Sequence, residues 1–361
     1  MKKMSKTFIN NAITYALVIV AFIVMTILQN AGVLTRSMKG QLVPICVYIV
    51  MAVSLNLVLG ISGELCLGHA GFMSVGAFTG VVAAACLAGG VPNPTLRLIL
   101  AMIVGGLLAA VAGVIIGVPV LRLRGDYLAI VTLAFGEIIR NVINCLYVAL
   151  DGSALRISFN NPVVQDPARA AEGLPFQMLI NGPQGATVSN KLSTFTMGFV
   201  LIIFSLIVVL NLINSRSGRA IMAIRDNRIA AESVGIGVTK YKMMAFVISA
   251  ALAGMAGALY SLNYSTVTAS KFKFDTSILV LVFVVLGGIG NIRGSIIAAT
   301  LLTVLPELLR AFNDYRMLIY AIVLILVMLN TNNPRFKQLR ESLMEKLRRG
   351  KGAGNESEGG V

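Results

Sequence analysis

The sequence predicts an all-α polytopic membrane protein with about ten transmembrane helices arranged in two related halves. Hydrophobic residues make up 57% of its 361 residues, above the roughly 45–50% that is usual for soluble domains. Charged residues make up only 12%, and 30 Lys and Arg against 15 Asp and Glu give a net charge of +15. This composition argues against a disordered chain, an ordinary soluble enzyme and a nucleic-acid-binding protein, whose basic residues lie on a polar scaffold.

Ten apolar segments are candidates for membrane spans. A spanning helix needs about 20 mostly apolar residues, and the glycine-rich run 287–294 interrupts the region of the eighth and ninth candidates. We interpret the first candidate as an anchor and not as a signal peptide, because no small-residue cleavage site follows it. The candidates are Ala12–Leu28, Gln41–Gly60, Ala70–Gly90, Leu96–Val120, Tyr127–Val148, Thr194–Ile213, Met244–Tyr264, Ser277–Gly290, Ser295–Leu309 and Leu318–Leu329.

The distribution of Lys and Arg predicts the orientation, because cytoplasmic loops of membrane proteins are enriched in these residues. Three lysines lie in the first six residues, six basic residues lie in 214–242 and seven follow Asn330, whereas the polar segment 151–193 holds three. We therefore expect both termini and 214–242 in the cytoplasm and 151–193 outside. Residues 1–330 are predicted to form one transmembrane domain, and residues 331–361 a cytoplasmic polar tail that is partly disordered.

Two parts of the chain follow a similar pattern. Residues 108–113 and 252–257 are rich in small side chains, and a loop with an Asp and then a bulky apolar run follow each of them. A transporter built from two related halves has internal repeats of this kind. Chance similarity between helices rich in Ala and Gly is the alternative.

The sequence lacks the patterns of common catalytic and metal sites. It has no GxxxxGK[ST] run for ATP, its four cysteines form no CxxC pair, and His69 is the only histidine. No Ser or Cys nucleophile has a base at a recognisable spacing. We therefore predict a protein that is not an enzyme, with no metal and no cofactor on this chain; a membrane enzyme with a buried site is the weakest alternative.

Two glycine-rich segments interrupt the predicted spans and are candidates for a translocation pathway. They cover residues 59–72 and 287–294. Non-helical backbone at membrane depth is tolerated only where protein or a water-filled cavity covers it. Close helix packing through small residues is the alternative explanation. The pathway candidates in and beside these segments are Asn56, Glu64, His69, Phe72, Gly287 and Gly288.

Charged residues inside a membrane are expensive, by at least about 2.5–3.5 kcal/mol at a helix centre, and so they indicate function. Glu137 and Arg140 are three residues apart in the fifth candidate span, where they share a helix face and can pair. We include both as pathway candidates. A structural pair that holds adjacent helices together is the favoured alternative.

The basic segment Ser215–Lys242 is predicted to hold a short helix that docks into a cytoplasmic partner. Asp226 is expected to cap a helical turn around Ala231 and Glu232, and Gly235 to end it. We assign Arg225, Asp226, Ala231, Glu232 and Gly235 to this coupling element. The alternative is an ordinary basic loop on anionic lipid, which explains the arginines but not the capped turn.

Several motifs, in order and at matching spacing, make the chain from about Val47 to Leu329 resemble the permeases of branched-chain amino acid ABC importers, the LivM type. These motifs are Ser54–Gly60, Leu67–Phe72, Leu123–Tyr127, Ala134–Arg140, Ser217–Ala220, Ala231–Ile236 and Val284–Gly290. The resemblance implies a type II-like ABC importer permease in the bacterial plasma (inner) membrane. It also implies a second permease subunit, two cytoplasmic ATPase subunits that bind ATP and Mg, and a periplasmic or lipid-anchored solute-binding protein. The family's coupling helix would correspond to Asp226–Gly235.

The resemblance leaves the substrate open. The family's outer segment ends near a Thr-Gly-Gly-x-x-Gly-Ile run, where this chain has Asn181–Thr187 instead. We expect branched-chain or other small amino acids; urea, amides or another small solute of the same superfamily are alternatives. A stand-alone secondary transporter, with Glu137 and Arg140 as its coupling-ion site, is a further alternative.

Overall fold

The computed structural model describes residues 6–32, 35–123, 125–151, 154–164, 176–188 and 190–309, and a few single positions between 315 and 325. Residues 1–304 form one compact unit and residues 305–361 a second. The predicted tail 331–361 lies outside the described residues, and so does most of the tenth candidate span.

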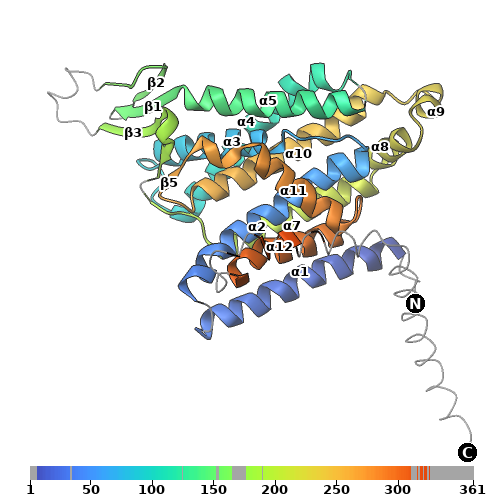
Figure 1. Cartoon of the computed structure of the whole chain (residues 1–361), viewed down its shortest axis with the longest axis horizontal. Helices are drawn as coiled ribbons and strands as arrows, with labels where there is room; N and C mark the ends of the chain where they lie inside the picture. The colour runs from blue at the N-terminus through green and yellow to red at the C-terminus, as the bar shows by residue number, and fades with distance from the viewer. Residues whose placement is uncertain are drawn as a thin grey trace, which may run out of the picture. The chain divides into compact units, whose positions relative to one another are not determined.

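Helices make up most of the described chain (Figure 1). Two 3-10 turns, η2 (Gly182–Gln184) and η3 (Ala269–Phe272), and one π-helical turn, η1 (Leu57–Ser62), accompany them. The helices are α1 (Lys6–Asn30), α2 (Arg36–Asn56), α3 (His69–Cys86), α4 (Pro94–Val120), α5 (Asp126–Asn144), α7 (Phe195–Asn214), α8 (Arg216–Asp226), α9 (Arg228–Ser233), α10 (Val238–Ser261), α11 (Phe274–Gly287) and α12 (Ile292–Leu308).

Within the described residues, helices occupy the positions of nine of the ten candidate spans. Six of them, in α1, α2 with η1, α3, α4, α7 and α10, are long and apolar enough to cross a membrane. By contrast, α11 has 14 residues, α12 has 17, and α5 carries three charged side chains. Length and composition therefore support six spans within the described residues, and the total of ten stays a prediction.

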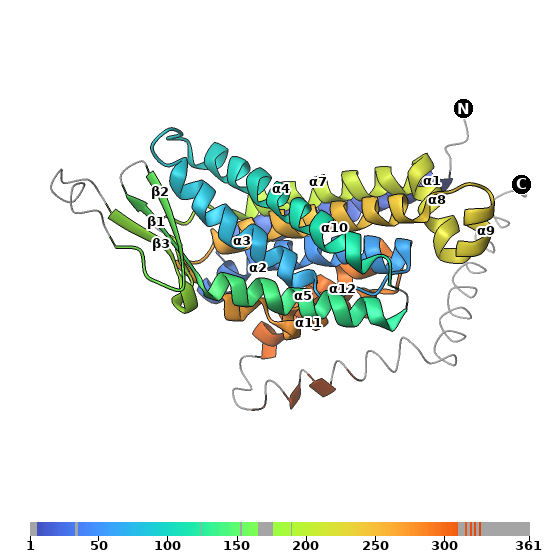
Figure 2. The same ribbon diagram turned by 90° about the horizontal axis from the view of Figure 1, so that it is seen from above.

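Small residues bring three helices close together in the middle of the first unit. α3, α4 and α10 pack against one another (Figure 2). A side chain at Gly76 of α3 would overlap the backbone of Gly254 in α10, and one at Gly257 would overlap the backbone of Met73. Close approach through small residues is a common mode of helix association in membranes. α4 and α10 hold the small-residue segments of the two proposed halves, but their contact does not test the repeat, which stays a prediction.

The fold class needs one correction, because the structure contains strands as well as helices. β1 (Leu146–Asp151), β2 (Ala154–Phe159), β3 (Phe176–Asn181), β4 (Ala186–Thr187) and β5 (Thr266–Val267) form one antiparallel sheet in the order β2-β1-β3-β4-β5. α5 consequently ends at Asn144, before the predicted end of the fifth span. In β2, exposed apolar and more polar side chains alternate, a period of two that favours a strand.

The sheet and the α8–α9 pair lie at opposite ends of the helix bundle, as both views show (Figures 1 and 2). These are the two hydrophilic segments that the charge distribution predicts on opposite sides of a membrane. Their separation agrees with that prediction.

Candidate translocation and coupling site

The first glycine-rich segment consists of a π-helical turn at the end of a helix, followed by a residue with left-handed backbone conformation. α2 passes into the π-helical turn η1, and Gly63 then takes a positive φ of 76° before the chain reaches α3 at His69. Such π-helical turns are rare and frequently lie at functional sites. A side chain at Gly63 would also meet the Arg225 side chain at 2.7 Å. The predicted break between the second and third spans is therefore present.

The second glycine-rich segment is a tight turn between two short helices. α11 ends at Gly287, and Gly288 and Gly290 have positive φ values of 93° and 82° before α12 begins at Ile292. A side chain at Gly287 would overlap the backbone at Gly294, so the turn closes on itself. The break predicted between the eighth and ninth spans is also present.

The two breaks, more than 200 residues apart in sequence, meet at Asn56. The Asn56 side-chain amide donates to Ser295 Oγ at 2.9 Å, and its Oδ1 accepts the Gly290 N–H at 2.9 Å. A side chain at Gly60 would overlap both Asn56 and the Gly290 backbone. We call this assembly, made of Asn56, Gly60, Gly290 and Ser295, the joint. Asn56 is fully buried, and it satisfies backbone that helical hydrogen bonds leave free.

His69 and Phe72 lie beside the joint as packing residues. Ser54 Oγ and His69 Nε2 are 2.8 Å apart, and Ser249 of α10 donates to the Ser54 carbonyl at 2.6 Å. Phe72 packs edge-to-face on Phe246, with ring centroids 5.4 Å apart. These contacts tie α3 to α2 and α10. Whether either side chain meets a solute in another conformation stays a prediction.

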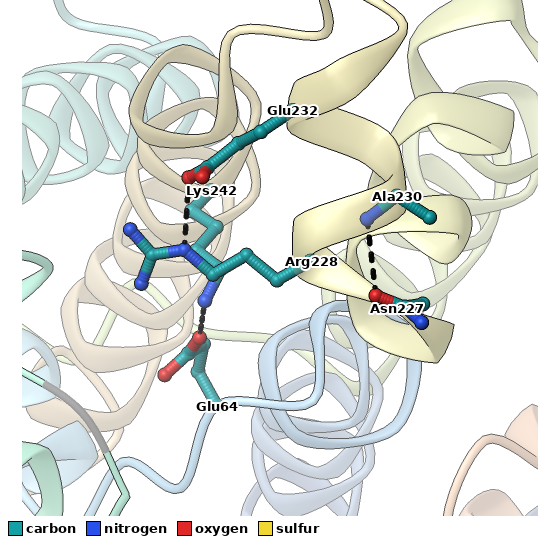
Figure 3. Close-up of polar contacts among 6 residues, drawn as sticks. All are labelled: Glu64, Asn227, Arg228, Ala230, Glu232 and Lys242. Atoms are coloured by element: carbon teal, nitrogen blue, oxygen red, sulfur yellow. Dashed lines mark hydrogen bonds and ion pairs between the residues drawn. The ribbon is translucent and has the colours of Figure 1, made fainter.

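Glu64 forms an ion pair with Lys242 of α10, and Figure 3 shows the two side chains end to end. The pair is largely buried, with 11% and 12% of the side chains exposed. Sequence reasoning counted Lys242 only among the basic loop residues and missed this role. The available signal is that Glu64 is a lone acid inside an apolar region, where a partner is expected.

Arg225, at the end of α8, reaches the joint directly. Its Nη1 donates to the Gly60 carbonyl at 2.8 Å, and its Nη2 lies 2.9 Å from Asp226 Oδ1. Since Gly60 belongs to the π-helical turn, this hydrogen bond links the predicted coupling element to the first break. Arg225 and Lys242 together hold the segment 60–64 from α8 and α10.

The cap of α9 corrects one prediction. Asn227, and not Asp226, caps this helix, because Asn227 Oδ1 accepts the Ala230 N–H at 3.1 Å (Figure 3). Asp226 belongs to the last turn of α8 and pairs with Arg225 instead. The helix begins one residue later than expected, so the capping position moves to the neighbouring side chain.

The end of α9 is built as predicted. Gly235 has a φ of 81°, its N–H donates to the Glu232 carbonyl at 3.0 Å, and the Ile236 N–H donates to the Ala231 carbonyl at 3.0 Å. This is a Schellman ending, for which Gly is the preferred residue. Ala231 is buried against Ile224 and Val238, so α9 is held in place on α8 and α10.

Two apolar side chains, one on α9 and one at the residue that follows it, are left uncovered by the described part of the chain. Ile229 is 81% exposed and Val234 is 75% exposed. Arg228 and Glu232 form an i,i+4 ion pair at 3.0 Å, which supports the single turn (Figure 3). A short, capped and rigidly seated helix with apolar side chains on its surface is suited to fitting into a groove on a partner protein.

Glu137 and Arg140 form the ion pair predicted from their spacing. Arg140 Nε donates to Glu137 Oε2 at 2.7 Å, and both belong to α5. The pair is partly exposed and is not part of the joint. The ion pair itself lies within one helix; whether it helps to hold adjacent helices and its place on a translocation pathway stay predictions.

The described architecture is that of a membrane-embedded permease: a bundle of apolar helices with two broken segments that meet, and the predicted docking element, α8–α9, bonded to them. Residues 37–328 match the family described as branched-chain amino acid transport system / permease component. The chain therefore belongs to that family.

Three relatives show how far the similarity extends. The chain is 36% identical over 302 residues to the high-affinity branched-chain amino acid transport system permease protein LivM of Escherichia coli, which covers 78% of this chain and 66% of that protein. It is 27% identical over 202 residues to a probable LivM of Methanocaldococcus jannaschii, covering 55% and 52%. It is 31% identical over 151 residues to LivH of Salmonella typhimurium, covering 40% and 49%. The chain thus spans just under two-thirds of the length of the Escherichia coli relative and about half of the length of the other two. No solved structure matches it.

Proposed function

We propose that the chain is a membrane-spanning subunit of an ATP-driven importer for branched-chain or other small amino acids. The relatives named LivM and LivH are permease proteins of branched-chain amino acid transport systems, which supports this substrate class. The membrane is the bacterial plasma (inner) membrane, with both termini in the cytoplasm. ATP and Mg bind to partner ATPases, since this chain has no nucleotide-binding motif.

One observation carries the proposal: hydrogen bonds and an ion pair connect the two helix breaks to the docking element, α8–α9, and to α10, which follows it. Arg225 connects α8 to Gly60, Lys242 connects α10 to Glu64, and Asn56 connects both breaks. Movement of α8–α9 by an ATPase therefore pulls on the π-helical turn, and Asn56 passes the displacement to the turn at Gly290. Alternating access follows if the joint has two arrangements.

In this proposal, the other subunits of the importer bind at the two ends of the helix bundle. A pair of ATPases binds α9 of this chain and the equivalent helix of a second, LivH-like permease subunit, and the solute crosses between the two permeases. A periplasmic or lipid-anchored solute-binding protein approaches the sheet. Asn181–Thr187 runs from the end of β3 through η2 to β4, so its departure from the family pattern lies at that end.

The proposal is tested by purifying the tagged chain and identifying the subunits that accompany it. We expect an ATPase and a second permease, and we expect Ile229→Glu to remove the ATPase, because a charge on the docking face must be desolvated. Purification without any ATPase contradicts the proposal. Uptake driven by an ion gradient in vesicles that hold this chain alone contradicts it as well.

The connection through Arg225 is tested in the assembled importer. Arg225→Ala removes the hydrogen bond to Gly60, and we expect ATP hydrolysis to continue while solute uptake falls at least tenfold. Arg219→Ala is the matched control, because Arg219 lies on the same helix and, within the described residues, its side chain donates to the nearby Asn214 carbonyl and not to the joint. Equal uptake by the two variants contradicts the proposed route of force.

A further inference from the structure

A large apolar groove lies between α1 and the helix bundle, at the edge where α1 runs beside α2 and α12 (Figure 1). Its volume is about 740 Å³, and residues of α1, α2, α7 and α12 line it. Every described residue of the lining is uncharged, and the Thr300 hydroxyl donates to the Ile296 carbonyl of its own helix at 2.8 Å. An apolar cavity of about 150 Å³ already stays dry and takes up small apolar molecules, so this groove suits an apolar ligand and not water.

Contacts at both ends of the groove fasten α1 to the bundle. At one end, Arg293 Nε at the start of α12 donates to Thr14 Oγ1 at 2.7 Å. At the other end, Phe22 stacks on Phe199 of α7, with ring centroids 4.0 Å apart. The α1 lining of the groove extends over this stretch, from Ile13 to Met25. The groove therefore lies along a part of α1 that is anchored on both sides.

The groove has the position and the length that a lipid acyl chain needs. α1, α2 and α7 are each long and apolar enough to cross a membrane, so in a membrane the groove lies at the level of the hydrocarbon core. At a rise of about 1.5 Å per residue, its lining on α1 is about 18 Å long. One leaflet contributes about half of a hydrocarbon core of about 30 Å, so one extended acyl chain can lie along the groove.

Arg293 gives one mouth of the groove a positive charge. It precedes Ile296 and Ile297 of the lining by about one helical turn. It is also close in sequence to Ser295 of the joint, which Arg225 of α8 reaches, so this mouth is at the α8–α9 end of the bundle. That end is the predicted cytoplasmic side, where anionic lipids make the membrane surface negative. A guanidinium binds phosphate oxygens through a planar set of N–H donors, so the mouth suits a phosphate-bearing headgroup.

We propose that this groove binds an anionic phospholipid, with one acyl chain between α1 and the walls formed by α2, α7 and α12, and with the headgroup phosphate on Arg293. The bound lipid is then part of the packing of α1 against the bundle, next to the second helix break. Binding needs neither an ATPase nor a second permease. Only the choice of leaflet rests on the proposed orientation.

The experiment uses the fact that the chain contains no tryptophan, so that a single introduced indole reports which lipid lies beside it. Leu301→Trp places the indole at the rim of the groove, and Leu107→Trp, on the exposed face of α4, is the matched reference for lipid that only surrounds the protein. The full-length chain is placed in vesicles of phosphatidylcholine and phosphatidylglycerol, with bromine on the acyl chains of one lipid at a time. Bromine quenches indole fluorescence on contact.

We expect the Leu301→Trp variant to prefer phosphatidylglycerol over phosphatidylcholine at least fivefold, because only the former carries a net negative charge to the guanidinium. The Leu107→Trp variant is expected to show no preference. Equal quenching of the Leu301→Trp variant by both brominated lipids indicates ordinary surrounding lipid. Quenching by neither lipid indicates that protein fills the groove. Each of these two results overturns the inference.

Substitutions of arginine in the Leu301→Trp background test the headgroup contact. Arg293→Gln is expected to abolish the preference, whereas Arg293→Lys keeps the charge and retains most of it. Arg216→Gln is the matched control, because it removes a charge at the start of α8, at the same end of the bundle and outside the lining. An unchanged preference in Arg293→Gln overturns the inference, and so does an equal loss in Arg216→Gln.

A further pair of substitutions tests the groove while Arg293 stays in place. Ala21→Leu puts a larger side chain into the lining and is expected to reduce quenching by brominated phosphatidylglycerol at least twofold. Ala12→Leu, on the same helix but outside the lining, is expected to leave it unchanged. Equal quenching in the two variants overturns the inference. These measurements need only this chain and lipid, so their failure leaves the purification of partner ATPases unaffected and the two proposals are tested apart.

Discussion

The two glycine-rich breaks look alike in sequence but are held in different ways. The first, around residues 57–68, is fastened to neighbouring helices by charged side chains, Arg225 from α8 and Lys242 from α10. The second, around 287–294, is a compact turn that bonds to Asn56 of α2 and whose Arg293 donates to Thr14 Oγ1 of α1 at 2.7 Å. The first break is therefore tied to α8 and α10 and the second to α1 and α2, and Asn56 links the two breaks to each other.

The largest expected effect on stability comes from removing a charged side chain that holds the first break. Lys242→Met leaves the Glu64 carboxylate buried without its partner, and we expect the free energy of unfolding to fall by about 3–5 kcal/mol. The double variant Glu64→Gln with Lys242→Met removes both charges and is expected to recover much of that loss. Chemical or thermal unfolding of the purified chain in detergent measures both values. If Lys242→Met alone is as stable as the unmodified chain, the ion pair does not hold the first break.

A smaller change tests whether the two breaks are pressed together. Gly60→Ala places a methyl group against Asn56 and the Gly290 backbone, and we expect a loss of about 1–3 kcal/mol from overpacking. Gly40→Ala, in the helix α2 that leads into the turn of Gly60, is the control, because a side chain there meets nothing within 4 Å. The control is expected to leave stability unchanged or to raise it by up to about 1 kcal/mol through helix propensity. Equal unfolding midpoints for the two variants contradict a close contact between Gly60 and the Gly290 backbone.

The smallest expected effect concerns the docking element alone. Asn227→Ala removes the cap of α9 and is expected to cost about 1 kcal/mol, whereas Asp226→Ala leaves the cap in place. Hydrogen exchange at the amides of α9 measures the difference, since a lost cap lets the short helix open more often. Faster exchange in Asp226→Ala than in Asn227→Ala would return the capping role to Asp226.

Much of the fold could be predicted from hydrophobicity and charge. The apolar runs located the helices, and the distribution of Lys and Arg separated the sheet end from the α8–α9 end. The strands were missed because an apolar run such as Leu146–Leu150 continues the preceding helix in composition, so that length and hydrophobicity alone do not mark where α5 ends. The capping position was wrong by one residue, which is the usual precision of a helix boundary.

The candidate site was predicted in its parts and not in its assembly. Asn56, Glu64, Arg225 and the two glycine breaks were each identified, but their partners were not. Lys242 is 178 residues from Glu64, and Ser295 is 239 residues from Asn56. Local periodicity and spacing carry no information about contacts over such separations.

The sequence by itself determined that this is a multi-pass membrane protein, where most of its helices lie and which glycines interrupt them, because these properties depend on composition within a window of about 20 residues. Only the tertiary structure decided that the two interruptions form one joint and that Arg225 and Lys242 reach it. Those facts depend on how helices pack, and close packing is decided by the shapes of distant surfaces that meet only in the folded chain.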